Sequence, residues 1–196
     1  MKETGWKKLA GIAAGVLALL SIMGCGGAGE KEEIYPLTVD GTAITLDETT
    51  MQTIYDAGFE VSVLDTSSTP VQWYEVEADM PLDAESVYTG IYIGRDGVKY
   101  ASVSVVTEDA CAMKDGVIYA LRNTEDGLDK VTISSVLLTD LTEEKAKEIE
   151  SRLEANEYFQ SYVTDYKILR IKRENGDTGA VTEMEVEVRY EIDYTG

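Results

Sequence analysis

The chain has 196 residues, a net charge of −20 at pH 7 and no histidine. An apolar fraction of 44% excludes wholesale disorder. So strong a negative charge repels nucleic acid and anionic membrane faces, so neither is expected to bind this surface by charge. Without histidine there is no Ser-His-Asp or Cys-His catalysis, no histidine-bearing zinc site and no histidine-based pH sensor.

Residues 1–24 predict a secretory signal peptide. Lys2, Lys7 and Lys8 precede an apolar run from Leu9 to Met23. A helix of this length covers about 22 Å, which is short of the roughly 30 Å hydrocarbon core of a bilayer. The segment is therefore typical of a cleaved leader rather than of a permanent transmembrane helix.

Cys25 directly follows this leader, and the run Leu20-Ser21-Ile22-Met23-Gly24-Cys25 resembles the lipobox of bacterial lipoproteins. In that family a diacylglycerol is attached to the cysteine, and the chain is cleaved just before it. The resemblance implies lipidation of Cys25 and attachment to the outer face of the bacterial cell membrane. Two acyl chains anchor a protein stably, whereas one binds only marginally. The alternatives are an ordinary secretory signal with an incidental cysteine and an uncleaved anchor.

Residues 25–33 are expected to form the lipidated cysteine and a flexible tether, of which Gly26–Glu33 would span roughly 15–17 Å. Without the leader, which carries three lysines and one glutamate, the chain keeps 14 basic and 36 acidic residues, a net charge of −22. Such acidity attracts cations or basic partners, or serves solubility outside the cell. Cys111, the second cysteine, lies in an apolar, strand-like stretch and is expected to be a buried, inert thiol.

Residues 34–196 predict an α+β domain of mostly antiparallel strands with two short helices packed on one side and a possible subdivision near 125–130. The expected elements of the first half are a hairpin over 35–46, a helix over 48–57 capped by Asp47, a strand over 61–64, a strand over 71–78 and a hairpin of 87–93 with 99–105. In the last hairpin we expect a three-residue loop, Arg95-Asp96-Gly97, that places Ile91 opposite Ala101. A two-residue loop would place Ile91 opposite Ser102 and mix the two faces.

The second half is expected to hold a hairpin over 110–121, a strand over 130–138, a helix over 143–155, a strand over 166–173 and a strand over 184–194. In the last strand, apolar residues from Met184 to Tyr194 alternate with charged ones, which predicts one buried and one wet face. Four basic residues are expected to lie near its acidic row, as cross-strand charge pairs or as a basic ligand-binding patch: Lys167, Arg170, Lys172 and Arg173.

Thr38–Glu48 is similar in order and kind to Thr132–Glu143, since each is a β segment that runs into a capped helix. Tandem βαβ-type modules sharing one sheet would explain this, and so would chance. The order of elements also resembles small secreted lipoproteins of Gram-positive bacteria. The cues are Gly-x-x-Ile-Thr-Leu at Gly41–Leu46 before a helix ending Ala57-Gly58-Phe59, and Leu-Thr-x-Glu-x-Ala at Leu141–Ala146. This resemblance implies no activity.

No set of residues dictates a reaction. Two facing carboxylates could support glycoside hydrolysis, but nothing singles out a pair. Asn123–Asp129 offers oxygen ligands without the spacing of an EF-hand, so an acidic turn is expected there rather than a calcium site. Six aromatic residues on strands are expected to serve packing, with a binding face as the alternative: Trp73, Tyr74, Tyr88, Tyr92, Tyr100 and Tyr119.

The sequence thus predicts a lipid-anchored surface protein that is not an enzyme and has neither cofactor nor metal, and that acts as a binding or envelope-accessory module. A solute- or cation-binding lipoprotein is the alternative, and a carboxylate-based hydrolase is a third hypothesis. The expected partners are the membrane, through diacylglycerol on Cys25, and a protein or another component of the cell envelope. Nucleic acid is not expected as a partner.

Overall fold

Antiparallel strands and two short helices make up the part of the chain that the computed structural model describes, which is residues 32–66, 69–175 and 178–189. The elements up to β7 are β1 (Leu37–Val39), β2 (Thr42–Ile44), α1 (Met51–Asp56), β3 (Glu60–Asp65), β4 (Gln72–Glu75), β5 (Pro81–Leu82), β6 (Ser86–Arg95) and β7 (Val98–Thr107). They are followed by β8 (Cys111–Ala112), the 3-10 helix η2 (Met113–Asp115), β9 (Val117–Asn123), η3 (Glu125–Gly127), β10 (Val131–Ile133), β11 (Val136–Leu137) and η4 (Leu138–Asp140). The last are α2 (Glu143–Ile149), β12 (Glu154–Ala155), β13 (Gln160–Val163), β14 (Lys167–Asn175) and β15 (Thr178–Val188).

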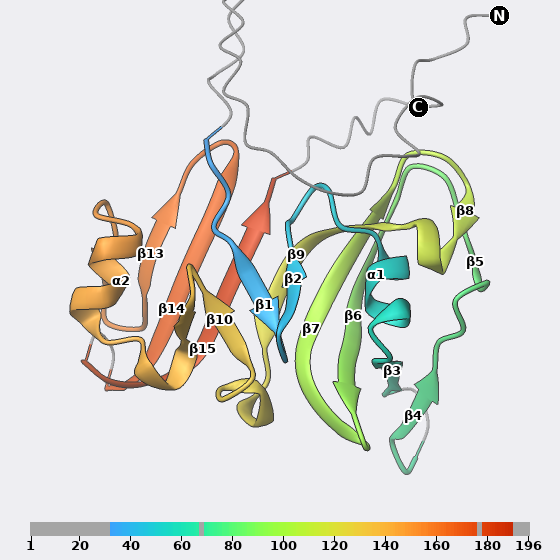
Figure 1. Cartoon of the computed structure of the whole chain (residues 1–196), viewed down its shortest axis with the longest axis horizontal. Helices are drawn as coiled ribbons and strands as arrows, with labels where there is room; N and C mark the ends of the chain where they lie inside the picture. The colour runs from blue at the N-terminus through green and yellow to red at the C-terminus, as the bar shows by residue number, and fades with distance from the viewer. Residues whose placement is uncertain (1–31, 67–68, 176–177, 190–196) are drawn as a thin grey trace, which may run out of the picture. The chain divides into compact units, whose positions relative to one another are not determined.

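The described strands form a nine-stranded sheet in the order β12-β13-β14-β15-β9-β7-β6-β3-β4, a four-stranded sheet β11-β10-β1-β2 and the pair β5-β8 (Figure 1). The α+β class with mostly antiparallel strands is confirmed. Tandem βαβ-type modules are not supported, because every described strand pair is antiparallel and a βαβ unit needs parallel neighbours.

The two similar segments of the sequence instead meet in the smaller sheet as hairpin–helix units. The hairpin β1–β2 precedes α1, the hairpin β10–β11 precedes α2, and β1 pairs with β10. Thr38 faces Thr132, its counterpart in the other hairpin, and their hydroxyl oxygens lie 2.8 Å apart. A two-fold relation between like units places equivalent residues opposite each other in this way.

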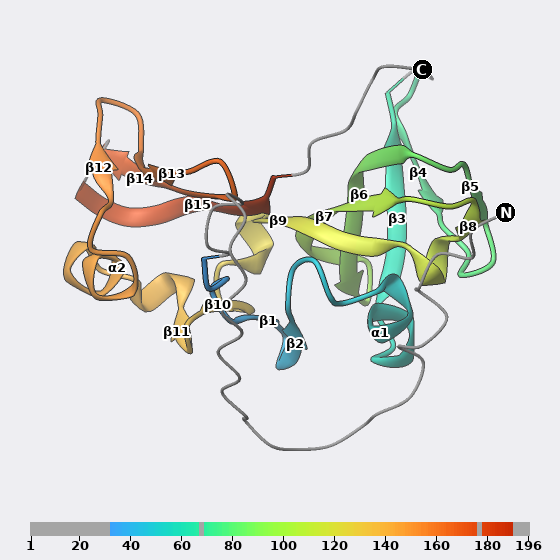
Figure 2. The same cartoon turned by 90° about the horizontal axis from the view of Figure 1, so that it is seen from above.

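One hydrophobic core lies under the nine-stranded sheet. Figure 2 shows α1, α2 and the smaller sheet on the same side of the long one. The largest fully buried side chains come from both halves of the chain: Leu37, Ile44, Leu46, Met51, Ile54, Ile91, Ile93, Met113, Ile118, Leu121, Ile133 and Leu138. Each such side chain stabilises the fold by about 1.5–3 kcal/mol relative to its exposed state.

The register expected for the β6–β7 hairpin is wrong. Arg95 pairs with Val98, so the loop is the two-residue Asp96-Gly97, with φ values of 52° and 79° that suit the twist of a hairpin. A bulge then shifts the register by one residue, and Ile93 faces Ala101. The bulge keeps the apolar side chains on one face, which a two-residue loop alone would not do.

Three other expected elements differ from the structure. The hairpin over 110–121 does not form, because β8 pairs with β5 and Met113–Asp115 is a 3-10 turn. The strand over 130–138 is broken at Ser134-Ser135, whose φ values of 48° and 66° turn the chain back into β11. The helix over 143–155 ends at Ile149, and Glu150 is extended.

α1 is also shorter than expected. It begins at Met51 with Thr50 as its N-cap residue, and Asp47, the expected cap, has a φ of 70° in the preceding turn. Asp47 therefore lies too far before the helix to cap it.

The pairing of β14 with β15 is confirmed over the described residues, whereas 190–194 lie outside them. Arg170 faces Glu185 and forms an ion pair with it at 2.8 Å, and Lys172 faces Glu183. Cross-strand charge matching is therefore correct for these two basic residues. It is wrong for Lys167 and Arg173, which are in phase with the buried side chains of β14 and are themselves buried.

Candidate functional site

The predicted lipid anchor lies outside the described residues, since the leader, Cys25 and residues 26–31 all precede Glu32. Glu32 and Glu33, which were expected to belong to the tether, contact the folded domain. These two residues therefore belong to the folded domain. In the described ranges no helix combines the length and the apolar character needed to cross a membrane.

Lys167 lies at the centre of the contacts that Glu32 and Glu33 make with the domain. It stands at the start of β14 on the buried side of the sheet, so its side chain is only 5% exposed and its charge needs partners. The Lys167 ammonium donates to the Glu33 carbonyl oxygen at 2.7 Å and lies 3.5 Å from the Glu32 carboxylate. It also lies 4.0 Å from the Glu150 carboxylate and 4.1 Å above the ring of Tyr35.

Glu150 provides the second buried charge. It follows the last turn of α2, and its carboxylate accepts hydrogen bonds from the Tyr35 hydroxyl at 2.8 Å and from the Arg152 guanidinium at 2.8 Å and 3.0 Å. Burial acts to raise the pKa of Glu150, but the hydrogen bonds from Arg152 and Tyr35 outweigh it and hold this pKa below the ordinary value. The guanidinium of Arg152 also lies 3.3 Å from Glu32 and covers the ring of Tyr162 at 4.1 Å.

We call these six residues the N-terminal clasp: Glu32, Tyr35, Glu150, Arg152, Tyr162 and Lys167. Both carboxylates are engaged, because Glu32 also accepts from the Tyr162 hydroxyl at 3.1 Å. Burial and the hydrogen bond to Glu150 raise the pKa of Tyr35, and burial and the hydrogen bond to Glu32 raise that of Tyr162. With its acids paired and its phenols held protonated, the clasp is suited to holding the chain in place rather than to moving protons.

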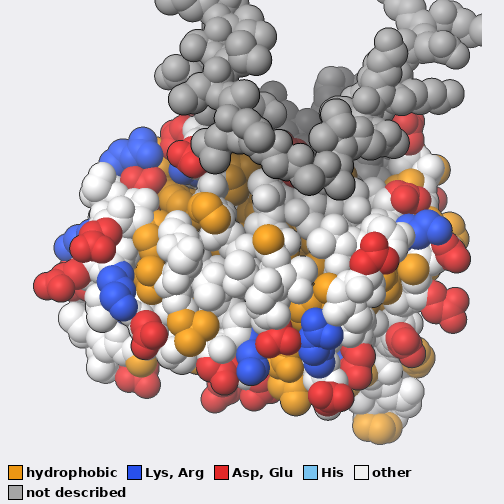
Figure 3. All heavy atoms as spheres, viewed as in Figure 1, with side chains coloured by type: hydrophobic (Ala, Val, Ile, Leu, Met, Phe, Trp, Pro, Cys, Tyr) orange, Lys and Arg blue, Asp and Glu red, His pale blue; other side chains and the backbone are white. Residues whose placement is uncertain are grey.

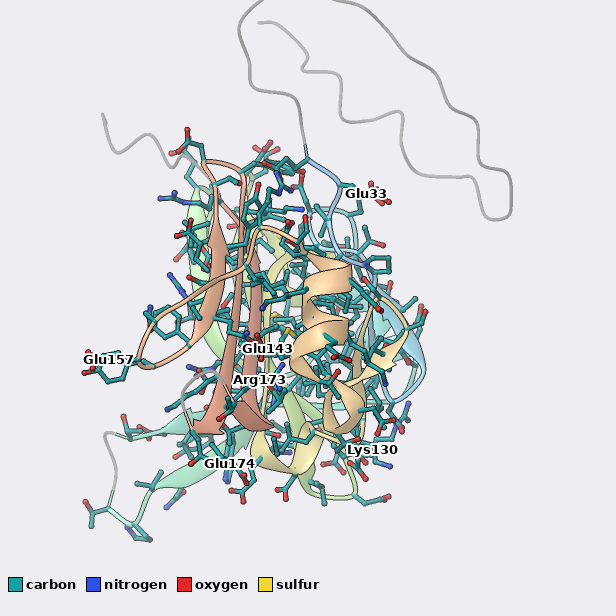
Figure 4. All side chains as sticks on the ribbon, turned by 90° about the vertical axis from the view of Figure 1, so that its left-hand side faces the viewer. Glu33, Lys130, Glu143, Glu157, Arg173 and Glu174 are labelled. Carbon is teal, nitrogen blue, oxygen red and sulfur yellow. The ribbon has the colours of Figure 1, made fainter. Side chains whose placement is uncertain are left out.

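The clasp fixes where the chain leaves the domain. It joins residues 32–35 to β13, β14 and the residues after α2. Figure 4 shows Glu33 at the upper end of the long strands and Glu174, at the far end of β14, near the lower end. A segment anchored at Cys25 would therefore meet the domain at one defined end.

One of the two edges of the nine-stranded sheet, at β4, is the second candidate site. We call it the β4 edge: Leu64, Val71, Trp73, Tyr74 and Glu75. Every residue of β4 is exposed, and Val71, Trp73 and Tyr74 are 53%, 48% and 48% exposed. Large apolar side chains at an open strand edge are unusual, since edges of soluble proteins are commonly protected by charges.

The Trp73 side chain is held in place by its neighbours. Its ring meets the Tyr92 ring edge-on, with centroids 4.9 Å apart, and the Lys99 ammonium lies 5.7 Å from its centroid. Leu64 stands opposite it on β3. Trp73 is thus a rigid exposed side chain, which loses less conformational entropy on binding than a mobile one would.

Most of the remaining strand aromatic residues are partly buried, which agrees with the expected role in packing. Tyr88 and Tyr100 are partly buried against the core. Tyr119 on β9 is half-buried. The six residues do not form one continuous aromatic face: Trp73 and Tyr92 are in contact, and the others are distributed over β4, β6, β7 and β9.

The acidic loop Asn123–Asp129 does not form a ligand cage. The Asn123 side chain is buried and its oxygen accepts from the Met184 backbone amide at 2.6 Å. Within the ranges that the structure describes, no three Cys, Asp or Glu side chains gather closely enough to hold a metal ion. Figure 3 shows acidic side chains around the rim of the face seen in Figure 1, with lysine and arginine side chains among them.

Cys111 is half-buried in β8, and its thiol is less deeply buried than expected. Burial and, to a lesser degree, Asp115 and Asp109 raise the pKa of Cys111, so the thiol stays protonated and weakly nucleophilic at neutral pH. This agrees with an inert thiol.

Arg173 is a structural residue. Its buried guanidinium donates to the Gln160 side-chain oxygen at 3.1 Å and to the backbone oxygens of Leu141 at 2.8 Å and Gly179 at 3.2 Å. It therefore joins β14 to β13 and to the start of α2. A basic ligand-binding patch of four residues is not formed, because Lys167 and Arg173 are buried.

Comparison of the chain with protein-family models, with curated proteins and with solved structures finds no match. The sequence did not predict the clasp, and it offered Trp73 and Tyr74 only within an alternative aromatic binding face. The signal for the clasp is the phase of Lys167, which is two residues before Leu169 and four before Ile171 on the buried face. The signal for the β4 edge is the apolar and aromatic content of Val71–Tyr74 in an otherwise acidic stretch.

Proposed function

We propose that the chain is a lipid-anchored protein of the outer face of a bacterial cell membrane and acts there as a non-catalytic binding module. The leader and the lipobox-like run before Cys25 support the anchor. The observation that carries the rest is the clasp. Only the six residues 26–31 separate Cys25 from Glu32, and a glycine-rich tether of that length spans about 12–15 Å. The clasp end of the domain is then held close to the bilayer.

This arrangement implies a direction for the β4 edge relative to the membrane. In Figures 1 and 4 the start of the described chain lies at the upper end of the molecule and β4 at the lower end. A domain anchored through a short tether at the clasp would present β4 away from the membrane, toward the cell envelope. An exposed Trp73 and Tyr74 on that side suit recognition of a macromolecule.

Replacement of Cys25 by serine tests the anchor. We expect Cys25→Ser to abolish incorporation of a labelled fatty acid in growing cells. Serine has a hydroxyl group in place of the thiol that receives the diacylglycerol. Cys111→Ser is the matched control, and it should be labelled like the unaltered chain. Persistent labelling of Cys25→Ser would contradict the proposed anchor.

A further inference from the structure

β4 offers unpaired backbone groups at regular positions. The Val76 amide donates to the Val61 carbonyl oxygen at 2.9 Å, and the register pairs Tyr74 with Val63 and Trp73 with Leu64. Bonded and non-bonded pairs alternate along antiparallel strands, so Val76 and Tyr74 bond to β3. The amide and carbonyl groups of Trp73 and Glu75 therefore point outward from the sheet.

β4 is short and carries the charge of Glu75, but it lacks three other features that prevent pairing with another strand. Protected edges carry lysine, proline or a bulge. β4 consists of Gln72-Trp73-Tyr74-Glu75, and its pairing with β3 is regular over all four residues. Since successive side chains alternate, Trp73 and Glu75 lie on one face and Tyr74 on the other. An added strand would thus find an apolar contact on both faces.

The charge next to this edge is negative and unmatched. Glu75 and Glu77 are exposed, and within the described ranges neither forms an ion pair with a lysine or arginine. In contrast, Glu60 and Asp79 nearby are paired with Lys99 and Lys114. Opposite charges on facing strands stabilise a pairing and like charges oppose it. The unmatched carboxylate of Glu75 selects a basic residue on whatever strand pairs here.

We propose that the β4 edge binds an extended, basic segment of another protein as an additional strand of the nine-stranded sheet. The proposal rests on the proposed function as a binding module and names its partner class. Recognition combines backbone hydrogen bonds to Trp73 and Glu75 with an apolar side chain beside Trp73 and a lysine or arginine beside Glu75, two positions along. A second copy of the chain is a poorer occupant, because it would bring Glu75 and Glu77 against the same charges.

Amide hydrogen exchange of the full chain in detergent tests this pairing. The probe is the capped peptide Thr-Val-Thr-Lys-Thr-Val-Thr-Lys, which places valine and lysine alternately on one face, and its control has glutamate in place of lysine. We expect the lysine peptide at saturation to slow exchange at the Trp73 and Glu75 amides at least tenfold. The Tyr74 amide, already bonded to β3, should change little. Binding without this pattern of protection would overturn the proposal.

A charge reversal separates loss of recognition from loss of fold. Glu75→Lys should bind the glutamate peptide at least tenfold more tightly than the lysine peptide, which an unfolded variant cannot do. Glu75→Pro removes an outward amide without removing a bond to β3, and should weaken binding of the lysine peptide more than Glu75→Ala does. An unchanged peptide preference in Glu75→Lys, or protection of the same amides by self-association, would overturn the proposal. Either result would leave fatty-acid labelling of Cys25 unchanged, so failure of the β4 proposal can be distinguished from failure of the proposed lipid anchor.

Discussion

At the scale of single residues, the clasp depends on two buried charges that the sequence places far apart. The side chains of Lys167 and Glu150 are each 5% exposed. Each charge is surrounded by groups of opposite charge and by hydrogen-bonding partners. The alternation along β14 shows that Lys167 shares a face with Leu169. It does not show which acids Lys167 meets, because Glu32 and Glu150 come from other segments of the chain.

Removal of one clasp carboxylate should be costly. Glu150→Ala leaves the Lys167 ammonium with one buried partner fewer and frees the Tyr35 hydroxyl, and we expect a loss of about 3 kcal/mol in the free energy of unfolding. Glu148→Ala, at an exposed position on α2, should change it by less than about 0.5 kcal/mol. Urea unfolding of the two variants checks the difference, and equal stabilities would show that the clasp contributes nothing.

The clasp should also make stability depend on pH at both extremes. The pKa of Glu150 is lowered on folding, so its contribution is present above the ordinary value of 4.5 and is lost as pH falls below it. The pKa of Tyr35 is raised, so its contribution is present below 10.0 and is lost as pH rises above that value.

Glu187 acts in the opposite sense at low pH, because burial and Glu185 raise its pKa and protonation relieves the cost of its charge. Thermal unfolding between pH 3 and pH 6 separates these contributions. Glu150→Gln should flatten the acid dependence, whereas Glu187→Gln should steepen it. The reverse assignment would contradict the lowered pKa of Glu150.

At the scale of elements, local patterns predicted which segments are strands better than how those strands pair. The Asp96-Gly97 turn and the alternation along 87–105 identify the β6–β7 hairpin. The bulge between Ile93 and Gly94 sets the register of this hairpin, and no residue near the bulge predicts it. The Ser134-Ser135 turn was missed for a related reason, since serine at positive φ is uncommon and gives no signal in the sequence.

Close contact between backbone segments requires glycine at position 127, as it does at Gly94. A Cβ atom at Gly127 would overlap the backbone of Tyr100, next to the bulge of β7. We expect Gly127→Ala to destabilise the domain by about 3 kcal/mol, because η3 or β7 has to move.

Gly97→Ala provides the comparison for Gly127→Ala. Its Cβ meets open space and only its φ of 79° opposes alanine, so a cost of about 1 kcal/mol is expected. Chemical denaturation of both variants ranks them, and a larger loss for Gly97→Ala would contradict the packing at η3.

At the scale of the whole molecule, the fold class followed from the sequence and the topology did not. Strand alternation and two short amphipathic helices are local signals, and they suffice for an antiparallel α+β domain. The pairing of β1 with β10, the central place of β9 and the free edge at β4 depend on contacts between distant segments. The similarity between Thr38–Glu48 and Thr132–Glu143 was visible, but it marks hairpin–helix units rather than βαβ modules.

Anchor, clasp and β4 edge form one account of the molecule. In our proposal a lipid on Cys25 holds the chain, the clasp fixes the end of the domain nearest the membrane, and the β4 edge is left for a partner. Binding at the β4 edge can be tested in a chain that has no lipid anchor. The proposed orientation of the domain relative to the membrane, in contrast, requires the anchor. The chemical state of the mature N-terminus is therefore the point on which the account depends.

Mass spectrometry of the N-terminal peptide, released from protein extracted from the membranes of the producing cells, tests this most directly. We predict a peptide that begins at Cys25 and carries the added mass of a diacylglycerol on its sulfur. A peptide that begins within residues 1–24, or one that contains an unmodified Cys25, would contradict it.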